Sequence, residues 1–348
     1  MQNLKTELAQ ILHTRLPQYF SSPEKTESFI EIQSDKIILT IPFACSGIFN
    51  QYGKDIFSEF CSQNNLEKEL NFDIKSVKGL QPDFVKNVIA VSSGKGGVGK
   101  STTAVNLAIS LQREGAKVGI LDADIYGPSI PILMGTVNQQ PQVLPNDKMQ
   151  PIMAHDIQTM SIGYLVDGDS ANIWRGPMAS RAFQQLYEET QWQALDYLIV
   201  DMPPGTGDIQ LTLAQQLPVC AAIIVTTPQD LALADAIKGI EMYKKVDVPI
   251  LGIVENMSYH TCSNCQHKEN IFGADGADKI AKRYLTNILQ KFPLSAAIRQ
   301  MGDAGSPLPL NTEGEKKISD LYSDMARNIS MQISEFKMHE QQISVVKV

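Results

Sequence analysis

The sequence predicts an α/β fold whose mostly parallel sheet is covered by helices on both faces, preceded by a small α+β N-terminal domain. Two observations predict it. After residue 80, near-continuous apolar runs alternate with helical stretches, which is typical of parallel strands buried on both faces; these runs cover residues 88–91, 118–121, 197–200, 221–225 and 250–254. Before residue 80, helical and strand-like spacings follow each other instead. With 348 residues, 43% of them hydrophobic, the chain can bury a large core and a small one.

The N-terminal region contains both periodicities in turn. Apolar residues at helical spacing predict helices over residues 4–12 and 48–60. Alternation predicts a half-buried strand over 37–41, and a closing strand is expected at 72–74. Glycine and proline in residues 78–84 mark a boundary. We therefore expect three parts: a small domain over 1–80, a large domain over 81–335 and a tail over 336–348.

Composition and charge exclude several classes of protein. A formal net charge of −8 argues against non-specific nucleic-acid binding, which needs a basic surface. No run approaches the ~18 consecutive apolar residues of a membrane span, and the first residues lack the basic and apolar regions of a signal peptide. We therefore expect a cytoplasmic protein that binds neither nucleic acid nor membrane. Its cysteines would be reduced there, and three in apolar stretches are expected to be buried: Cys45, Cys61 and Cys220.

A glycine-rich segment links the first apolar run to a helix expected over residues 100–113. Its sequence fits the nucleotide-binding P-loop pattern G-x-x-x-x-G-K-[ST] at Gly94, Gly99, Lys100 and Ser101. Backbone N–H groups of such a loop converge on phosphate oxygens at a helix N-terminus. Lys100 would reach the β- and γ-phosphates, and the Ser101 hydroxyl would ligate Mg²⁺. The large domain is therefore predicted to be a P-loop NTPase, whose nucleotide-binding residues are Gly94, Lys95, Gly96, Gly97, Val98, Gly99, Lys100, Ser101 and Thr102.

A carboxylate follows the third apolar run. Asp201 ends that run and fits a Walker-B residue that holds Mg²⁺ through water, although an isolated aspartate there is often only a helix cap. Residues 205–208, Gly-Thr-Gly-Asp, are expected to form a loop that senses the γ-phosphate. No strand is followed by the guanine-reading pattern Asn-Lys-x-Asp. We therefore expect the chain to bind ATP with Mg²⁺ and to hydrolyse it.

Two further cysteines form a C-x-x-C pair, Cys262 and Cys265, shortly after the fifth apolar run. A tetrahedral zinc ion or a four-iron cluster needs four ligands, so one pair supplies half of them. Three solutions are open. His260 and His267 could complete a Cys₂His₂ zinc site in one chain, the two thiols could cycle as a disulfide, or a symmetric dimer could supply two cysteines from each subunit to an iron–sulfur cluster.

The extra lysine of the P-loop, Lys95, adds a resemblance. The segment Gly-Lys-Gly-Gly-Val-Gly-Lys-Ser resembles the deviant P-loop of the superclass that contains MinD, ParA and the nitrogenase iron protein. The resemblance implies that Lys95 crosses a dimer interface to the partner's phosphates. It also implies that Asp124 orients the attacking water and that Asp122 assists near Mg²⁺. By the same resemblance, Asn256 contacts adenine and Pro228 lies in the loop beside the base.

Four segments together resemble one family within that superclass more closely. They are the P-loop, Leu-Asp-Ala-Asp-Ile-Tyr-Gly-Pro-Ser, Asp-Met-Pro-Pro-Gly-Thr-Gly-Asp, and Glu-Asn-Met-Ser-Tyr followed by C-x-x-C. From about residue 86 to residue 309, the chain is similar to the bacterial Mrp (ApbC) iron–sulfur cluster carriers. This resemblance implies a homodimeric ATPase with a labile cluster, [4Fe–4S] in type, held between subunits by Cys262 and Cys265. It also implies apo iron–sulfur proteins as recipients, assembly scaffolds as donors, and a MIP18-type domain over residues 1–80.

Two rival functions share parts of this pattern. A positioning or partition ATPase acting on membrane or DNA has the same deviant P-loop, but it gives no reason for the cysteine pair. A zinc or nickel metallochaperone accounts for the cysteines, and metal analysis would distinguish it.

Overall fold

The structure, a computed structural model, describes residues 2–75, 84–165, 176–262, 264–308 and 311–346. The chain divides into two compact units. Unit 1 consists of residues 1–77, 113–116 and 330–348, and unit 2 consists of residues 78–112 and 117–329. The predicted boundary near residue 80 lies outside the described residues, so the three-part division stays a prediction.

Unit 1 is a three-stranded sheet packed against helices. Strand β2 pairs with β1 in antiparallel and with β3 in parallel orientation. The alternation expected over residues 37–41 is observed, because Ile37, Leu39 and Ile41 are buried while their neighbours in β2 are partly exposed. The rings of Phe49 and Phe72 stack at 3.8 Å between centroids. The elements are α1 (Gln2–Arg15), α2 (Pro23–Glu27), β1 (Ile30–Ile32), β2 (Lys36–Ile41), α3 (Ser46–Ile48), the π-helical turn η1 (Phe49–Gly53), α4 (Lys54–Gln63) and β3 (Glu69–Ile74).

The sheet of unit 2 confirms the predicted α/β class. Its strands run in the order β11-β10-β9-β4-β8-β5-β7-β6, and β12 also pairs with β10. Among the described strands of this sheet, β6 and β11 are the ones that pair in antiparallel orientation. The strands are β4 (Val85–Ser92), β5 (Val118–Asp122), β6 (Ile152–Ala154), β7 (Ile157–Ser161), β8 (Leu195–Asp201), β9 (Val219–Thr226), β10 (Ile250–Thr261), β11 (Lys268–Glu269) and β12 (Ile288–Pro293).

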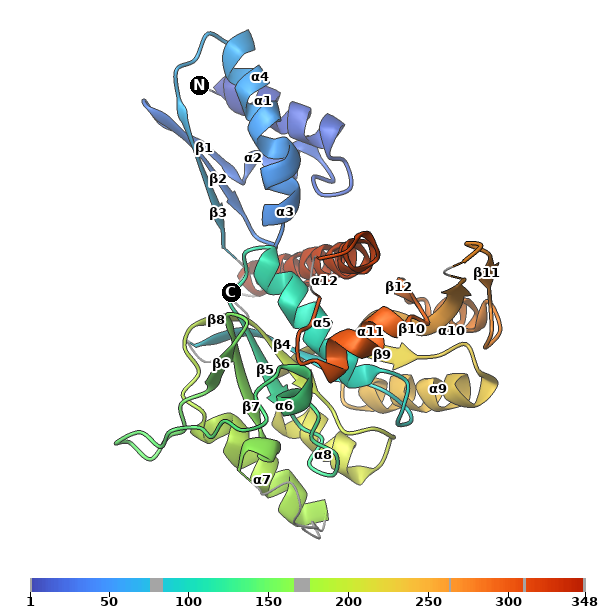
Figure 1. The fold of residues 1–348 in the computed structure, drawn as a ribbon. Helices are drawn as coiled ribbons and strands as arrows, with labels where there is room; N and C mark the ends of the chain where they lie inside the picture. Colours follow the sequence, from blue (N-terminus) through green and yellow to red (C-terminus); the bar gives the residue numbers. More distant parts are fainter. Residues whose placement is uncertain (1, 76–83, 166–175, 263, 309–310, 347–348) are drawn as a thin grey trace. The chain divides into compact units, whose positions relative to one another are not determined.

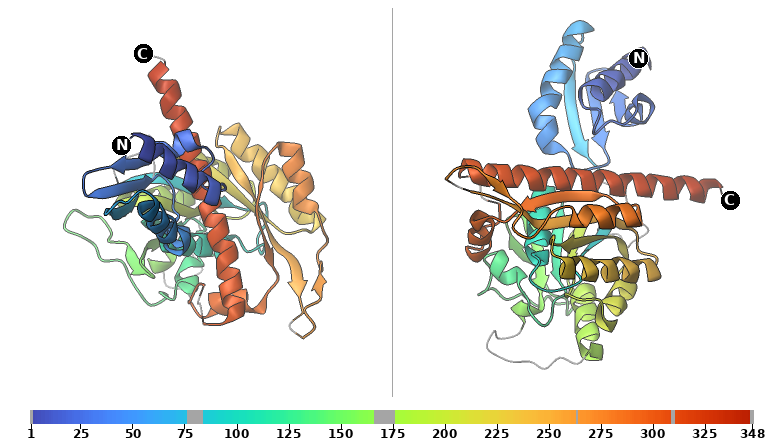
Figure 2. Two further views of the ribbon diagram at one scale, coloured as in Figure 1. Left: turned by 90° about the horizontal axis from the view of Figure 1, so that it is seen from above. Right: turned by 90° about the vertical axis from the view of Figure 1, so that its right-hand side faces the viewer.

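Helices cover both faces of this sheet (Figure 1). One face packs against α7 (Gly176–Glu189), α8 (Asp208–Gln216), α9 (Asp230–Lys245) and α10 (Gly276–Tyr284) in one apolar cluster. On the other face lie α5 (Lys100–Arg113) and the first half of α12 (Glu313–Val346), where Tyr322 stacks on Phe292 of β12 at 4.0 Å. Figure 2 shows the first half of α12 and the α7–α9 group on opposite sides of the sheet. The remaining helices are short: α6 (Ile130–Leu133), the 3₁₀ turn η2 (Ile162–Tyr164) and α11 (Ala296–Asp303).

Each of the five apolar runs expected to be a strand lies within one, namely β4, β5, β8, β9 and β10. These five strands are adjacent and parallel, so their carboxyl ends meet at one edge of the sheet. The predicted acidic and glycine-rich motifs therefore converge there.

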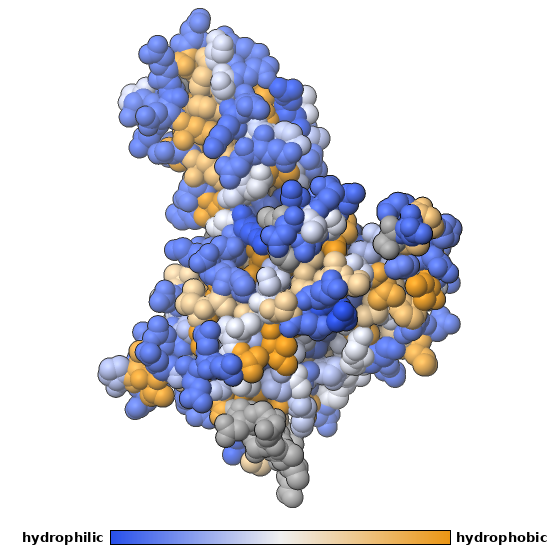
Figure 3. Space-filling model, viewed as in Figure 1, coloured by the Kyte–Doolittle hydropathy of each residue, from blue (hydrophilic) through white to orange (hydrophobic). Residues whose placement is uncertain are grey.

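The face of the molecule seen in Figure 3 is mostly hydrophilic, with smaller apolar patches between the hydrophilic side chains. In the part of the chain that the structure describes, no helix combines the length and the apolar character needed to cross a membrane. Cys45 is buried as expected, whereas Cys61 and Cys220 are only half-buried.

Candidate functional site

The P-loop connects β4 to α5, and its backbone conformation requires glycine. Gly97 and Gly99 have φ angles of 79° and 86°, in the left-handed region that favours glycine. Beside Gly96 and Gly97 the space within 4 Å of an added Cβ is empty among the described residues, so this part of the loop is open. Helix α5 begins at Lys100, which places the free N–H groups of its first turn at the end of the loop. The loop has the shape that phosphate binding needs.

Lys100 and Asp201 form a buried ion pair at the centre of the site. Lys100 Nζ lies 2.5 Å from Asp201 Oδ1, and the side chains are 6% and 0% exposed. Lys100 Nζ also donates to Ser101 Oγ at 3.2 Å. The other oxygen of Asp201, Oδ2, is buried without a hydrogen-bond partner among the described residues. A buried carboxylate oxygen without a partner is costly, so Asp201 Oδ2 has a site for a ligand to fill. Together with the Ser101 hydroxyl it offers the oxygen donors that fit Mg²⁺.

Asp122 is fully buried beside Asp201, its partner in the register of β5 and β8. Burial first, and then the Asp201 carboxylate, raise the pKa of Asp122 to about 7. Its oxygens already accept four hydrogen bonds, of 2.9–3.2 Å, from Asp124 N, Ser129 N, Ile130 N and Ser161 Oγ. These contacts hold the loop that follows β5. The role of Asp122 near the metal stays a prediction.

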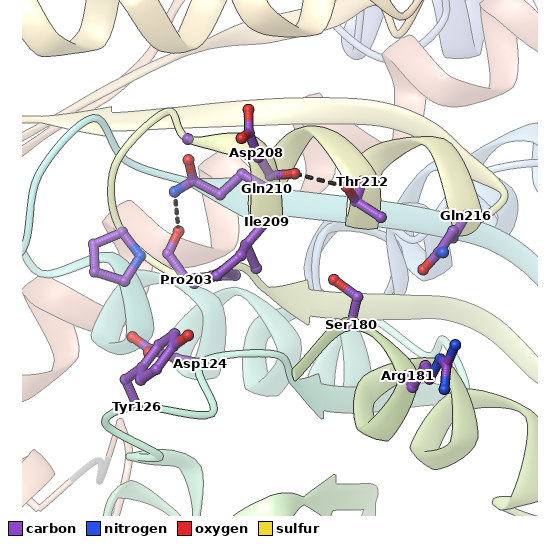
Figure 4. Close-up of a pocket in the computed structure, with 12 residues that line it drawn as sticks. Asp124, Tyr126, Ser180, Arg181, Pro203, Asp208, Ile209, Gln210, Thr212 and Gln216 are labelled. Carbon is purple, nitrogen blue, oxygen red and sulfur yellow. Dashed lines mark hydrogen bonds between the residues drawn. The ribbon is translucent and has the colours of Figure 1, made fainter. Parts of the chain in front are cut away.

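Asp124 lies at the wall of a cavity of about 810 Å³ next to the predicted switch loop (Figure 4). Tyr126 lies beside it, Ser180 and Arg181 of α7 line the opposite side, and residues 203–204 and 207–210 form the third wall. Burial raises the pKa of Asp124, while the charge of Lys100 acts in the opposite direction. Asp124 is therefore near both the P-loop lysine and a space that can hold water.

Sequence reasoning missed Gln210, whose side chain bonds to the backbone just before the predicted switch loop. Its side chain is 2% exposed, and its Nε2 donates to Pro203 O at 2.5 Å (Figure 4). Its Oε1 is buried without a partner among the described residues, although the amide lies within 4 Å of the Cβ position of Gly205. In the sequence, Gln210 is only a polar residue in the first turn of an expected helix. Sequence alone does not distinguish such a buried glutamine from a solvent-exposed one.

The predicted base-side residues lie at the ends of β9 and β10. Pro228 is buried in the loop that follows β9. Lys95 Nζ lies 3.5 Å from Oε1 of the adjacent Gln229 in the same chain. Asn256 is 7% exposed, and its Nδ2 donates to Val98 O of the P-loop at 2.9 Å. Asn256 therefore contacts the P-loop directly, while the predicted roles of Lys95, Pro228 and Asn256 toward a nucleotide stay predictions.

The cysteine pair lies on a turn at the far end of β10. His260 and Thr261 pair with Glu269 and Lys268 of β11, and this hairpin ends in the turn that holds both thiols. The Cys262 N–H donates to His267 O at 3.0 Å, and the Gln266 N–H donates to Cys262 O at 2.9 Å. In the turn, the backbone N–H of Cys265 and then that of Asn264 lower the pKa of Cys262 by donating to its sulfur. These hydrogen bonds favour the thiolate, which is the form of cysteine that ligates metals.

The histidines do not complete this site within one chain. Among the side chains that the structure describes, no three His, Cys, Asp or Glu residues are close enough together to hold a metal ion. His260 Nδ1 instead lies 3.2 Å from Leu294 O. A single chain thus presents two thiols, half of the four ligands that zinc or a four-iron cluster needs.

The sequence matches proteins with a shared description. Residues 84–330 match the ParA family model described as NUBPL iron-transfer P-loop NTPase. The iron-sulfur cluster carrier protein of Escherichia coli (strain K12) is 52% identical over 302 residues, covering 85% of this chain and 82% of its own. The iron-sulfur cluster transfer protein NUBPL of Mus musculus is 50% identical over 232 residues, covering 66% of this chain and 72% of its own.

Solved structures give the same fold. A nucleotide-binding protein from Archaeoglobus fulgidus, in complex with ADP, is 37% identical with a TM-score of 0.58, covering 64% of this chain and 87% of its own. The cell division ATPase MinD of Pyrococcus furiosus has a TM-score of 0.53 over 70% of this chain and 98% of its own, and its 20% identity shows the fold alone. With a family match over most of its length and relatives above 50% identity, the chain belongs to the NUBPL family of iron-transfer P-loop NTPases.

Proposed function

We propose that the chain is an ATP-hydrolysing iron–sulfur cluster carrier. Two copies hold a labile cluster between the Cys262 and Cys265 thiols of each subunit and pass it to apoproteins that need one. The observation that carries the proposal is the hairpin turn with its pair of thiols, one of them with a lowered pKa, at the end of a strand that contacts the P-loop. The names of the relatives support the same cargo.

The two-thiol turn also favours a cluster shared by a dimer. A [4Fe–4S] cluster takes four cysteine ligands, and a two-fold axis supplies two from each subunit. The same axis would bring Lys95 of one subunit to the nucleotide of the other, as an arginine finger acts in trans. Apo iron–sulfur proteins are the proposed recipients and cluster-assembly scaffolds the proposed donors.

In the nucleotide site, the P-loop amides and Lys100 bind the phosphates of ATP. Lys100 must leave Asp201 to do so, since the two form an ion pair in this structure. Asp201 and Ser101 would then hold Mg²⁺, which neutralises phosphate charge when bound. Asp124 orients the attacking water from the wall of the cavity, and Asp122 holds the loop that carries it.

Anaerobic reconstitution with iron and sulfide tests the cargo. Wild-type protein is expected to bind about four iron and about four sulfide per dimer, with visible-region absorption. Cys262→Ser and Cys265→Ser should lose this absorption and still bind ATP, because both thiols lie on a hairpin turn outside the P-loop. Cys61→Ser, which changes a half-buried thiol on α4, is the matched control and should bind a full cluster.

Two results would count against the proposal. One is a full cluster in Cys262→Ser. The other is wild-type protein, purified without oxygen, that holds zinc or nickel in place of iron, which would favour the metallochaperone. The cell division ATPase MinD of Pyrococcus furiosus shares this fold at 20% identity, and no feature of the described residues favours a positioning or partition function.

A further inference from the structure

β10 leads from the buried sheet, where Asn256 contacts the P-loop, to the cysteine turn. It runs from Ile250 to Thr261, and Cys262 follows at once. Its first half belongs to the buried sheet, pairing with β9 as far as Glu255 and Thr226. Its last two residues belong to the hairpin with β11. Any displacement between these halves must pass through residues 256–258.

These three residues form an irregularity in the strand. β10 advances four residues, from Glu255 to Tyr259, while β12 advances two, from Lys291 to Pro293. Such a bulge leaves extra residues unpaired and bends the strand. Within it, Met257 has a φ of 54°, a conformation that non-glycine residues rarely adopt. The surrounding contacts must therefore hold the bulge in this shape.

The P-loop touches the bulge through Asn256. Its amide donates to Val98 O, and a Cβ added to Gly99 would lie 2.1 Å from the same Nδ2 atom. The amide is thus packed against the backbone that would bind phosphates. A nucleotide that binds the second N–H or the Oδ1 of this amide would pull on a side chain that is already bonded to Val98 O, and so would shift Asn256.

Glu255 fixes the other side of the bulge, and sequence analysis gave it no role. Its carboxylate is 1% exposed and follows directly on the apolar first half of β10, residues 250–254. Ser258 Oγ donates to Oε1 at 2.5 Å, and the Ala277 N–H in the first turn of α10 donates to Oε2 at 3.0 Å. Lys291 Nζ lies 3.9 Å from Oε1. One carboxylate therefore joins the bulge to α10 and β12.

Beyond the bulge, contacts lead to the thiols. The Leu294 N–H donates to Tyr259 O at 2.7 Å, and Lys268 Nζ lies 3.7 Å over the Tyr259 ring. Lys268 belongs to β11, whose pairing with Thr261 sets the turn that starts at Cys262. The contacts thus form a continuous path from Val98 to the cysteine turn.

We propose that the bulge at residues 256–258 transmits the state of the nucleotide to the cysteine turn, and that Glu255 is the positioning residue that makes this possible. The inference rests on the proposed nucleotide and cluster sites. When a bound nucleotide shifts Asn256, the bulge changes shape. Glu255 fixes the start of the bulge to α10 and β12, so the sheet does not move. The change in the bulge therefore displaces the hairpin and alters the spacing of its two thiols.

The test measures thiol reactivity without any iron. Full-length, reduced, metal-free protein is treated with a maleimide, with and without a saturating non-hydrolysable ATP analogue and Mg²⁺. The tryptic peptide 246–268 contains both cysteines of the turn, so mass spectrometry follows their labelling, and Cys220 in another peptide is the internal reference. The wild-type rate is expected to change about fivefold with the analogue, the lower end for coupling between two sites.

Glu255→Gln should weaken this change while the analogue still binds, because the amide has one acceptor oxygen where the carboxylate has two, and it has no charge to face Lys291. Asp278→Asn is the matched control: it removes a neighbouring carboxylate that pairs with Lys291 and leaves the contacts of Glu255 with Ser258 and Ala277 in place. It should retain the wild-type change. Ser258→Ala removes one hydroxyl from the bulge and should reduce the change even if Glu255→Gln fails to fold.

Two outcomes overturn the inference: a folded Glu255→Gln, or Ser258→Ala, that keeps the full wild-type change, or a wild-type protein that binds the analogue with no change in labelling. Failure of the proposed function gives a different result. A protein whose labelling responds to nucleotide but which holds no cluster on reconstitution would support the coupling and refute the carrier.

Discussion

Replacing Lys100 with methionine tests the energetics of the nucleotide-free site. The substitution keeps the aliphatic chain and removes the charge that lies 2.5 Å from Asp201 Oδ1. Asp201 is 0% exposed and its Oδ2 already lacks a partner among the described residues, so the variant leaves the carboxylate unpaired. Removing one partner of a buried ion pair typically destabilises a protein by about 3–5 kcal/mol. We expect a loss of that order, or roughly 6–20 °C in Tm for a unit of this size.

Urea unfolding followed by tryptophan fluorescence measures this loss. Trp192 is buried in unit 2, and both tryptophans of the sequence fall within that unit, so the signal reports on the nucleotide-binding unit. Asp201→Asn and the double variant Lys100→Met/Asp201→Asn complete a thermodynamic cycle. The double variant should lose less free energy of unfolding than the two single losses combined, because it leaves no unpaired charge. Losses that simply add would refute the buried pair.

The destabilisation caused by Lys100→Met should also depend on pH. The folded pKa of Asp122 is raised from 3.8 to about 7, chiefly by burial and then by Asp201, while Lys100 lowers it. The folded chain therefore keeps a proton that the unfolded chain releases, and this group's contribution to stability falls as pH rises from about 4 to about 7. Lys100→Met removes the lowering charge, so its destabilisation relative to wild type should be larger at pH 8 than at pH 6. An equal loss at both values would contradict this sign.

Two further variants test local structure in each unit. Gly99→Ala places a Cβ 2.1 Å from Asn256 Nδ2 at a φ of 86°, so it should sharply weaken ATP binding measured by calorimetry. Gly314→Ala is the control, because its added Cβ meets no described atom within 4 Å, and it should leave the affinity unchanged. Equal affinities of the two variants for ATP would contradict the close packing at Gly99. Ser22→Ala removes the cap that accepts from the Lys25 N–H in α2 and should destabilise unit 1 by about 1 kcal/mol, measured by hydrogen exchange of that helix. Unchanged protection there would contradict the capping role.

Local patterns were enough to predict the strands that carry the site. Runs such as 88–91 and 197–200 are apolar because both faces of a parallel strand are buried, so they are visible without a partner. β6, β7 and β12 were not predicted. They are short, and polar residues such as Thr159 and Ser161 are buried in β7, so period and composition do not mark it as a strand. Their pairing depends on neighbours that are distant in sequence.

By itself, the sequence determined the chemistry on offer: a glycine loop with two lysines, carboxylates at strand ends and two thiols three residues apart. These are properties of short segments, and their order along the chain preserves them. The tertiary structure alone decided which groups meet. Asp122 and Asp201 become neighbours through the pairing of β5 and β8, Lys100 pairs with Asp201 across 101 residues, and Glu255 joins the bulge to α10. Such partners are set by long-range packing, which brings together residues whose separation in sequence carries no information about their distance in space.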